Sequence, residues 1–249
     1  MLVSIVCSLS LPAFSQGVAI YKKDGSMVKY AYEEIDSIVT YNYGEEPGTP
    51  SIPDTPVASQ YEAVDLGLSV KWATHNVGAT KPEEYGGYYA WGETEEKDNY
   101  SWSTYKWCKG SSSTMTKYCT NSSDGAVDGK TVLDPEDDVA HVKWGGDWRM
   151  PTKAELDELL TKCTLEWTSL NGVLGYKVTG PNGNSIFLPS AGYRFATDVY
   201  HGVRYDGYCW SSSLGSRSCD AGYLGFGDRY TVWADSNRYY GLSVRPVLK

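Results

Sequence analysis

The stretch Trp144-Gly145-Gly146-Asp147-Trp148-Arg149-Met150-Pro151-Thr152-Lys153-Ala154-Glu155 decides much of the fold, because it leads into the clearest helical pattern in the chain. Thr152, followed three residues later by Glu155, forms a capping box directly after Pro151. The apolar side chains that follow recur at helical spacing, at Leu156, Leu159, Leu160 and Cys163. The sequence therefore predicts a helix that begins after Pro151.

A second, shorter helix is expected upstream, in the acidic run 134–138. Asp134, then Pro135, then Glu136 and Asp137 fit the preferences of an N-cap and a first helical turn. Clustered carboxylates also suit a hard cation such as calcium, but this spacing matches no EF-hand loop. We therefore interpret the run as a helix start and predict no metal site.

The rest of the main region is typical of short strands and turns. Residues 61–66 and 69–73 flank a Gly-Leu turn, and no helical pattern is visible after Gly175. Helices in the middle and strands at the end predict an α+β fold. The main domain is expected over residues 61–249.

Three segments are expected before this domain. Residues 1–15 are typical of a signal peptide, because a short apolar run is followed by the small residues Ala13 and Ser15. Residues 16–43 predict a small β segment, with a hairpin around a turn at 22–25 and another short strand near 35–39. Residues 44–60 form a linker stiffened by four prolines. We expect an exported protein, at the cell surface or extracellular.

Charge and hydropathy exclude several classes of partner. The formal net charge of −9 argues against nucleic acid and anionic lipid, since both require a basic face. No apolar run approaches the roughly 20 residues of a membrane span. We therefore predict no nucleic-acid partner and no transmembrane span.

The sequence contains no pattern of catalysis or cofactor binding. The three histidines lack a paired nucleophile or an orienting carboxylate at a recognisable spacing. No Cys-x-x-Cys occurs, and the Gly-Ser run at 110–113 lacks the lysine of a phosphate loop. Cys108 and Cys119 either bridge a hairpin or remain thiols, and the sequence leaves both open. We expect no cofactor and no metal.

Residues 178–248 differ in composition from the rest of the chain. This stretch contains no Lys, Glu, Gln or Met, although the four types total 35 residues and random scatter would place about ten there. The same stretch holds six of the seven Arg and eight of the 21 Tyr. The composition of this stretch therefore needs an explanation of its own.

Two explanations account for this bias. Binding surfaces favour Tyr, Trp and Arg over Lys and Glu, and paratopes add Ser, Gly and Asn. The genetic code offers a tighter account, because an Asn codon with randomised adenines never yields Lys, Glu, Gln, Met or Trp. Trp210 and Trp233 would then be fixed framework residues.

Several segments carry a resemblance to a known family. They are the Trp144–Glu155 stretch, residues 61–73, Trp91-Gly92-Glu93, Tyr208-Cys209-Trp210-Ser211-Ser212-Ser213 and Tyr240-Gly241-Leu242-Ser243-Val244-Arg245-Pro246-Val247. Residues 61–249 resemble the bacterial major paralogous domain and the variable proteins of diversity-generating retroelements. The resemblance implies a C-type-lectin-like fold of the formylglycine-generating-enzyme type, with a diversified surface in the region of about 190–245.

The resemblance also divides the end of the chain into two sets. Its implied framework residues are Gly192, Tyr193, Trp210, Ser211, Ser212, Phe226, Trp233, Arg238, Ser243 and Arg245. The candidate ligand contacts are Phe195, Tyr200, His201, Arg204, Tyr205, Cys209, Arg217, Cys219, Asp220, Tyr223, Leu224, Arg229, Tyr230, Asp235, Tyr239 and Tyr240. We expect most of the second set to be exposed on one face.

The function expected from these patterns is ligand binding. The first hypothesis is a receptor or adhesin that binds a protein or cell-surface ligand; the alternatives are a carbohydrate-binding module and a structural surface protein. Sulfatase-modifying relatives of the fold are enzymes with a cysteine pair near the C-terminus. Cys209 and Cys219 have no matching motif around them, so we predict no enzyme.

Overall fold

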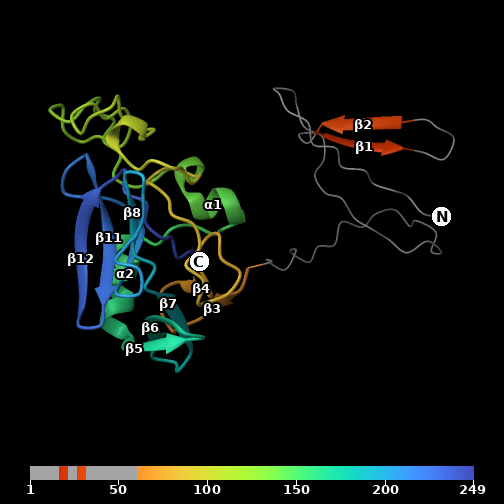
Figure 1. The fold of residues 1–249 in the computed structure, drawn as a ribbon, viewed down its shortest axis with the longest axis vertical. Coiled ribbons are helices and arrows are strands. Elements are labelled where there is room, and N and C mark those ends of the chain that lie inside the picture. The colour runs from red at the N-terminus through yellow and green to blue at the C-terminus, as the bar shows by residue number, and fades with distance from the viewer. Residues whose placement is uncertain (1–16, 22–26, 32–60) are drawn as a thin grey trace. The chain divides into compact units, whose positions relative to one another are not determined.

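The computed structural model describes residues 17–21, 27–31 and 61–249 (Figure 1). The chain divides into two units, residues 1–58 and 59–249. In the first, β1 (Gly17–Tyr21) and β2 (Met27–Ala31) pair antiparallel, where the sequence predicts a hairpin. The expected signal peptide, the strand near 35–39 and the linker at 44–60 lie outside the described residues.

The second unit is mostly β-sheet with few helices, which agrees with the predicted α+β class. Its helical elements are η2 (Trp102–Thr104), η3 (Pro135–Asp137), α1 (Val139–Trp144) and α2 (Lys153–Lys162). Its strands are β3 (Ala63–Val64), β4 (Lys71–Ala73), β5 (Thr164–Leu170), β6 (Val173–Thr179), β7 (Ser185–Pro189), β8 (Tyr193–Phe195), β9 (Asp198–His201), β10 (Asp206–Leu214), β11 (Asp220–Gly227), β12 (Tyr230–Asn237) and β13 (Val247–Leu248). They form antiparallel sheets in the orders β13-β4-β3, β5-β6-β7, β10-β11-β12 and β8-β9.

The two α-helices begin at well-defined caps. The capping box of Thr152 and Glu155 is present at the start of α2, and Leu156 and Leu159 are buried, as predicted. The expected short helix does start at Asp134, with Pro135 at its first position, but it is the three-residue 3-10 helix η3. The helix α1 that follows is separate: its cap is Asp138, whose carboxylate accepts hydrogen bonds from the backbone N–H groups of Ala140 and His141.

The end of the chain closes the second unit. Val247 of β13 pairs with Trp72 of β4 and also bridges to Arg149, in the segment just before α2. Close by, the buried Arg245 guanidinium donates to the Asn76 side chain at 2.9 Å and to backbone carbonyls of residues 73, 74 and 187. These contacts tie the last strand to the first ones.

The β10-β11-β12 sheet has two different faces. We call the inner face the one that carries Cys209, Leu224 and Phe226, which pack in one hydrophobic core with Leu156 and Leu159 of α2. Because side chains alternate along a strand, the neighbouring residues of β10 and β11 point to the outer face. Figure 1 shows α2 beside β11, on one side of this sheet.

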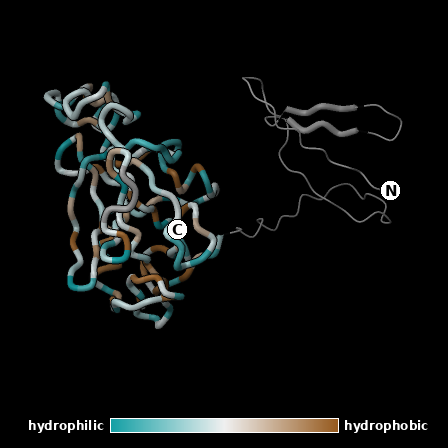
Figure 2. Tube along the Cα trace, viewed as in Figure 1, coloured by the Kyte–Doolittle hydropathy of each residue, from teal (hydrophilic) through white to brown (hydrophobic). Residues whose placement is uncertain are grey.

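Hydrophobic and hydrophilic residues alternate over short distances along the second unit (Figure 2). This pattern fits short strands with one buried face. Among the described residues, no helix is long and apolar enough to cross a membrane.

Candidate ligand-binding face

Tyrosines gather on the outer face of the β10-β11-β12 sheet. We define the tyrosine face as Tyr193, Tyr208, Tyr223, Tyr230 and Tyr240. The ring centroids of Tyr193 and Tyr208 lie 5.3 Å apart, those of Tyr208 and Tyr223 5.7 Å, and those of Tyr193 and Tyr240 5.6 Å. All five side chains are partly or well exposed, so the cluster is a surface and not a closed core.

Strand register explains how these rings come together. Tyr208 of β10 pairs with Gly225 of β11, and Gly225 pairs with Val232 of β12. A Cβ at Gly225 would lie 3.1 Å from both the Tyr223 ring and the Val232 side chain. Glycine therefore leaves the space that the neighbouring aromatic rings occupy.

A hollow of about 170 Å³ opens between four of these tyrosines. It is lined by Tyr193, Tyr208, Tyr223, Tyr240, Ser236 and Leu242. Burial raises the pKa of Tyr193, Tyr208 and Tyr223 above the ordinary phenol value, so these hydroxyls stay neutral and can both donate and accept hydrogen bonds.

A second, shallower hollow of about 460 Å³ adjoins the end of this face. The Tyr230 hydroxyl, in the lining of this second hollow, donates to the Asp206 carboxylate at 2.8 Å. Four of the predicted contacts, Arg204, Tyr205, Arg229 and Tyr230, line this second hollow together with Asp206, Asp228, Trp167 and Leu174. This region is charged, whereas the tyrosine-lined hollow is not.

The predicted contacts divide by exposure. The exposed ones are Phe195, Arg204, Tyr205, Arg217, Arg229, Tyr230 and Asp235, and the half-buried ones are Tyr223 and Tyr240. The side chains of Tyr200 and His201 lie outside the described part of the structure. The expected exposure is wrong for Cys209, Cys219, Asp220, Leu224 and Tyr239, which are all buried.

The alternation of strand residues and local packing explain these corrections. Cys209 and Leu224 belong to the inner face. Asp220 is held by the Arg217 side chain, whose Nε donates to the carboxylate at 2.7 Å. The Tyr239 ring packs edge-on against Trp102 at 4.7 Å, in the core that also contains Cys219.

The exposed candidates do not all share one face. Phe195 extends the tyrosine face, since its ring lies 5.4 Å from that of Tyr240. Arg217 and Asp235 lie at the opposite end of the sheet from Tyr230, where Asp235 accepts a hydrogen bond from the Ser216 N–H. The expectation of a single face is therefore wrong for Arg217 and Asp235.

The framework residues lie mostly inside the molecule. Eight of them are buried, namely Gly192, Trp210, Ser211, Ser212, Phe226, Arg238, Ser243 and Arg245. Tyr193 and Trp233 are half-buried. The Trp210 indole N–H donates to the Tyr89 carbonyl at 2.8 Å, which ties β10 to the segment that contains Tyr89.

Arg238 is the most extensively bonded of these residues. Its fully buried guanidinium donates to the Tyr105 hydroxyl at 2.8 Å and to the carbonyl oxygens of residues 117, 118 and 218. The same group lies 4.9 Å from the Trp91 ring centroid. It therefore joins β12 to the long irregular segment before α1.

Sequence reasoning missed Tyr208, Val232 and Ser236, which all belong to the outer face. The signal that could have found them is the two-residue strand period: Tyr208 stands two positions before Trp210, and Ser236 two after Ala234. Without strand register, however, the period alone does not say which face is open.

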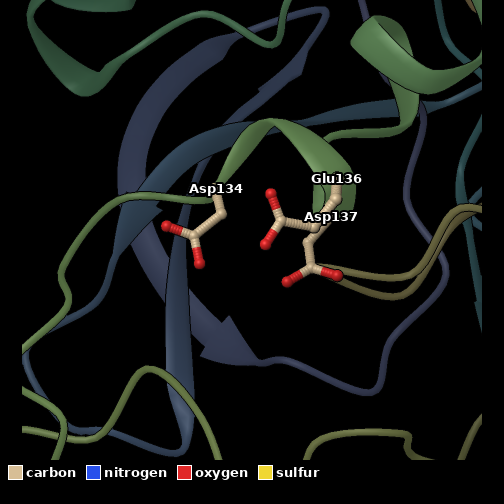
Figure 3. Close-up of side chains that lie close together, drawn as sticks. All are labelled: Asp134, Glu136 and Asp137. Carbon is tan, nitrogen blue, oxygen red and sulfur yellow. The ribbon is translucent and has the colours of Figure 1, made fainter.

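The acidic residues of the run 134–138 form ion pairs with a lysine of the same chain. The carboxylates of Asp134, Glu136 and Asp137 converge (Figure 3). The Lys117 ammonium group lies 2.6 Å from Asp134, 2.6 Å from Asp137 and 3.5 Å from Glu136. A lysine thus takes the place that a metal ion would need, and these residues fit a structural cluster.

The cysteines of the second unit are free thiols, including Cys108 and Cys119. Cys209 and Cys219 belong to different hydrophobic cores. Burial raises the pKa of Cys209 to about 11 and also raises that of Cys219, so both thiols stay protonated near neutral pH.

Comparison with known proteins gives no match to a family model, a curated protein or a solved structure.

Proposed function

We propose that this chain is an exported surface protein that binds a protein or cell-surface ligand through its tyrosine face. One observation carries the proposal: a single run of sequence, residues 190–245, supplies both a buried framework and a half-exposed aromatic surface. Tyrosine is enriched where proteins bind partners, because the ring gives contact area at low entropic cost and the hydroxyl forms hydrogen bonds.

A C-type-lectin-like scaffold is the fold that we propose for residues 61–249. Three features support it: few helices among short strands, the capping-box helix α2 after the Trp-Arg-Met-Pro-Thr block, and the pairing of β13 with β4. The name describes a fold and not a sugar ligand. The protonated, separated thiols of Cys209 and Cys219 support a binding role without catalysis.

We also propose that the exposed positions were diversified by adenine-directed mutagenesis. The positions of Trp210, fully buried, and Trp233, half-buried against the inner core, support this idea because both would be invariant framework residues. Sequencing the encoding DNA and its neighbourhood tests it. We expect an imperfect repeat that differs from the coding region at adenines, and a reverse transcriptase gene nearby. A neighbourhood without such a repeat would overturn this part of the proposal.

Binding itself is tested with arrays of purified bacterial surface proteins and of glycans, probed with the purified chain. We expect hits on the protein array that a Tyr208→Ser/Tyr223→Ser double variant loses and that a Val142→Ser variant retains. Val142 is an exposed control outside the tyrosine face. Discrete hits on the glycan array alone would favour the carbohydrate-binding alternative, which the half-exposed tyrosine rings also suit. The absence of hits on both arrays would favour a structural role.

A further inference from the structure

Several aromatic rings outside the tyrosine face lie close to a lysine or arginine side chain of the same chain. The Lys106 ammonium lies 4.2 Å from the Trp107 ring centroid, and Lys153 lies 4.6 Å from that of Trp233. Further rings that lie near a lysine or arginine are Tyr89, Trp91, Tyr100, Tyr105 and Tyr118. Pairing of a cation with an aromatic ring is thus a recurrent feature of the domain.

The tyrosine-lined hollow differs from these clusters. In the part of the chain that the structure describes, no lysine or arginine lies over the rings of Tyr208, Tyr223 or Tyr240. The hollow between these rings and Tyr193 nevertheless holds about 170 Å³, enough for one ammonium or guanidinium group. Among the described residues, Tyr208, Tyr223 and Tyr240 therefore line a hollow with no lysine or arginine over their rings.

The rings form walls and not a flat platform. The planes of Tyr193 and Tyr208 meet at 82°, those of Tyr208 and Tyr223 at 53°, and those of Tyr193 and Tyr240 at 40°. A group that enters the hollow therefore meets rings that are inclined to one another. A cation binds such a site where the electronegative face of a ring is turned toward it.

A carboxylate, that of Asp206, lies near the hollow. Asp206 lies on the same sheet face, two residues before Tyr208, and its carboxylate is fixed by the Tyr230 hydroxyl. After burial, this carboxylate is a further cause of the raised pKa of both Tyr193 and Tyr208, so its field extends to the hollow. Arg204 and Arg229 line the neighbouring hollow, together with Asp206 and Asp228.

We propose, on the basis of the proposed function, that the tyrosine-lined hollow binds the ammonium or guanidinium group of a lysine or arginine side chain on a protein ligand. An acidic group would meet the field of Asp206. A sugar would find no carboxylate or amide side chain in the lining to bind its hydroxyls. A purely apolar group would bury phenol hydroxyls without giving them partners.

Capped pentapeptides with one variable central residue between glycines test this proposal. The purified full chain, with ring-labelled tyrosine, is titrated by NMR with the lysine, arginine, norleucine and glutamate peptides. We expect saturable shifts of the Tyr208, Tyr223 and Tyr240 ring signals with lysine and arginine, and affinity about tenfold weaker with norleucine. Equal affinity for norleucine and lysine, or no saturation with either basic peptide, overturns the proposal.

Substitutions at one ring distinguish the aromatic face from the hydroxyl. Tyr223→Leu should weaken binding of the lysine peptide about tenfold, whereas Tyr223→Phe, which keeps the ring, should change it by less than about threefold. Tyr205→Leu is the matched control, because this tyrosine is exposed but lies outside the hollow. If Phe and Leu weaken binding equally, the hydroxyl is responsible and the proposal is wrong.

Asp206→Asn tests the charge separately. We expect the affinity for the lysine peptide to fall about threefold, while the affinity for the norleucine peptide stays unchanged. If the peptide experiments fail but the protein array gives hits, the proposed cation site is wrong and the proposed ligand-binding face stands. If the basic peptides bind but the array gives no hits, the cation site stands and the proposed role as a binder of surface proteins is wrong.

Discussion

The inner and outer faces of the β10-β11-β12 sheet are formed by alternating residues of the same three strands, yet the two faces differ in burial and in the kind of side chain they carry. On the inner face, Leu224 and Phe226 are buried against α2. On the outer face, Tyr223 and Val232 remain partly exposed, and Tyr223 lines a hollow. The contrast teaches that one strand can serve stability with every second residue and recognition with the others.

This contrast predicts that substitutions at framework residues cost stability, whereas substitutions on the outer face change mainly ligand binding. The following experiments test that division, and three of the four compare a buried or bonded residue with an exposed one.

Arg238→Ala should have the largest effect. It removes a buried guanidinium and leaves three carbonyls and the Tyr105 hydroxyl without their donor. We expect the free energy of unfolding to fall by about 3 to 5 kcal/mol in a urea titration. Arg229→Ala, at a side chain that is 93% exposed, should change it by less than about 0.5 kcal/mol. Similar losses in both variants would contradict the division.

Leu224→Ala tests the inner face alone. The side chain is 1% exposed in the core with α2, so truncation should cost about 3 kcal/mol of unfolding free energy. Val232→Ala, on the adjacent strand and the outer face, is the matched control and should cost about 0.5 kcal/mol, since this valine is 40% exposed. A Leu224 variant as stable as the Val232 variant would show that the core repacks freely.

Glu155→Gln should have a smaller effect that depends on pH. Burial opposes ionisation of Glu155, but hydrogen bonds from Arg149 and Thr152 outweigh it and hold the pKa below its ordinary value of 4.5. The ionised carboxylate therefore stabilises the fold above pH 4.5, and this contribution is lost as the pH falls further. Urea titrations should give a loss of about 1 to 2 kcal/mol at pH 7 and a smaller one at pH 3. An equal loss at both pH values would mean that the charge is not involved.

Tyr230→Phe should have the smallest effect on stability. It removes only the hydroxyl that donates to Asp206, at a side chain that is 40% exposed. Thermal unfolding should show a loss of about 0.5 kcal/mol, and Tyr205→Phe, at a tyrosine that is 75% exposed, should show none. A loss above about 2 kcal/mol would place Tyr230 with the framework and not with the binding face.

Local patterns in the sequence predicted the features that depend on nearby residues. The capping box placed α2 correctly, and of the Trp and Arg residues chosen as framework, Trp210, Arg238 and Arg245 are fully buried and Trp233 is half-buried. The acidic pattern also placed a helix start correctly at Asp134, the N-cap of η3, but it did not reveal the separate helix α1, whose cap is Asp138. The carboxylate of Asp138 also accepts from Met150 N–H, a contact between residues far apart in the pattern.

The candidate site was predicted less completely, because strand register cannot be read from composition. The bias of residues 178–248 pointed to the stretch that supplies the tyrosine face but gave Cys209 and Leu224 the same status as Tyr223. A shift of one residue in register exchanges the faces of a strand. Only the pairing of Tyr208 with Gly225, and of Tyr223 with Ala234, decides which side chains lie on the outer face.

The pairing of β13 with β4 brings the end of the chain next to the start of the second unit, away from β12 (Figure 1). Because its two ends lie side by side, this domain can be fused to another protein at one place without disturbing the tyrosine face. The same closeness should allow circular permutation, with a short peptide joining the original ends and new ends opened in an exposed hairpin turn such as 171–172.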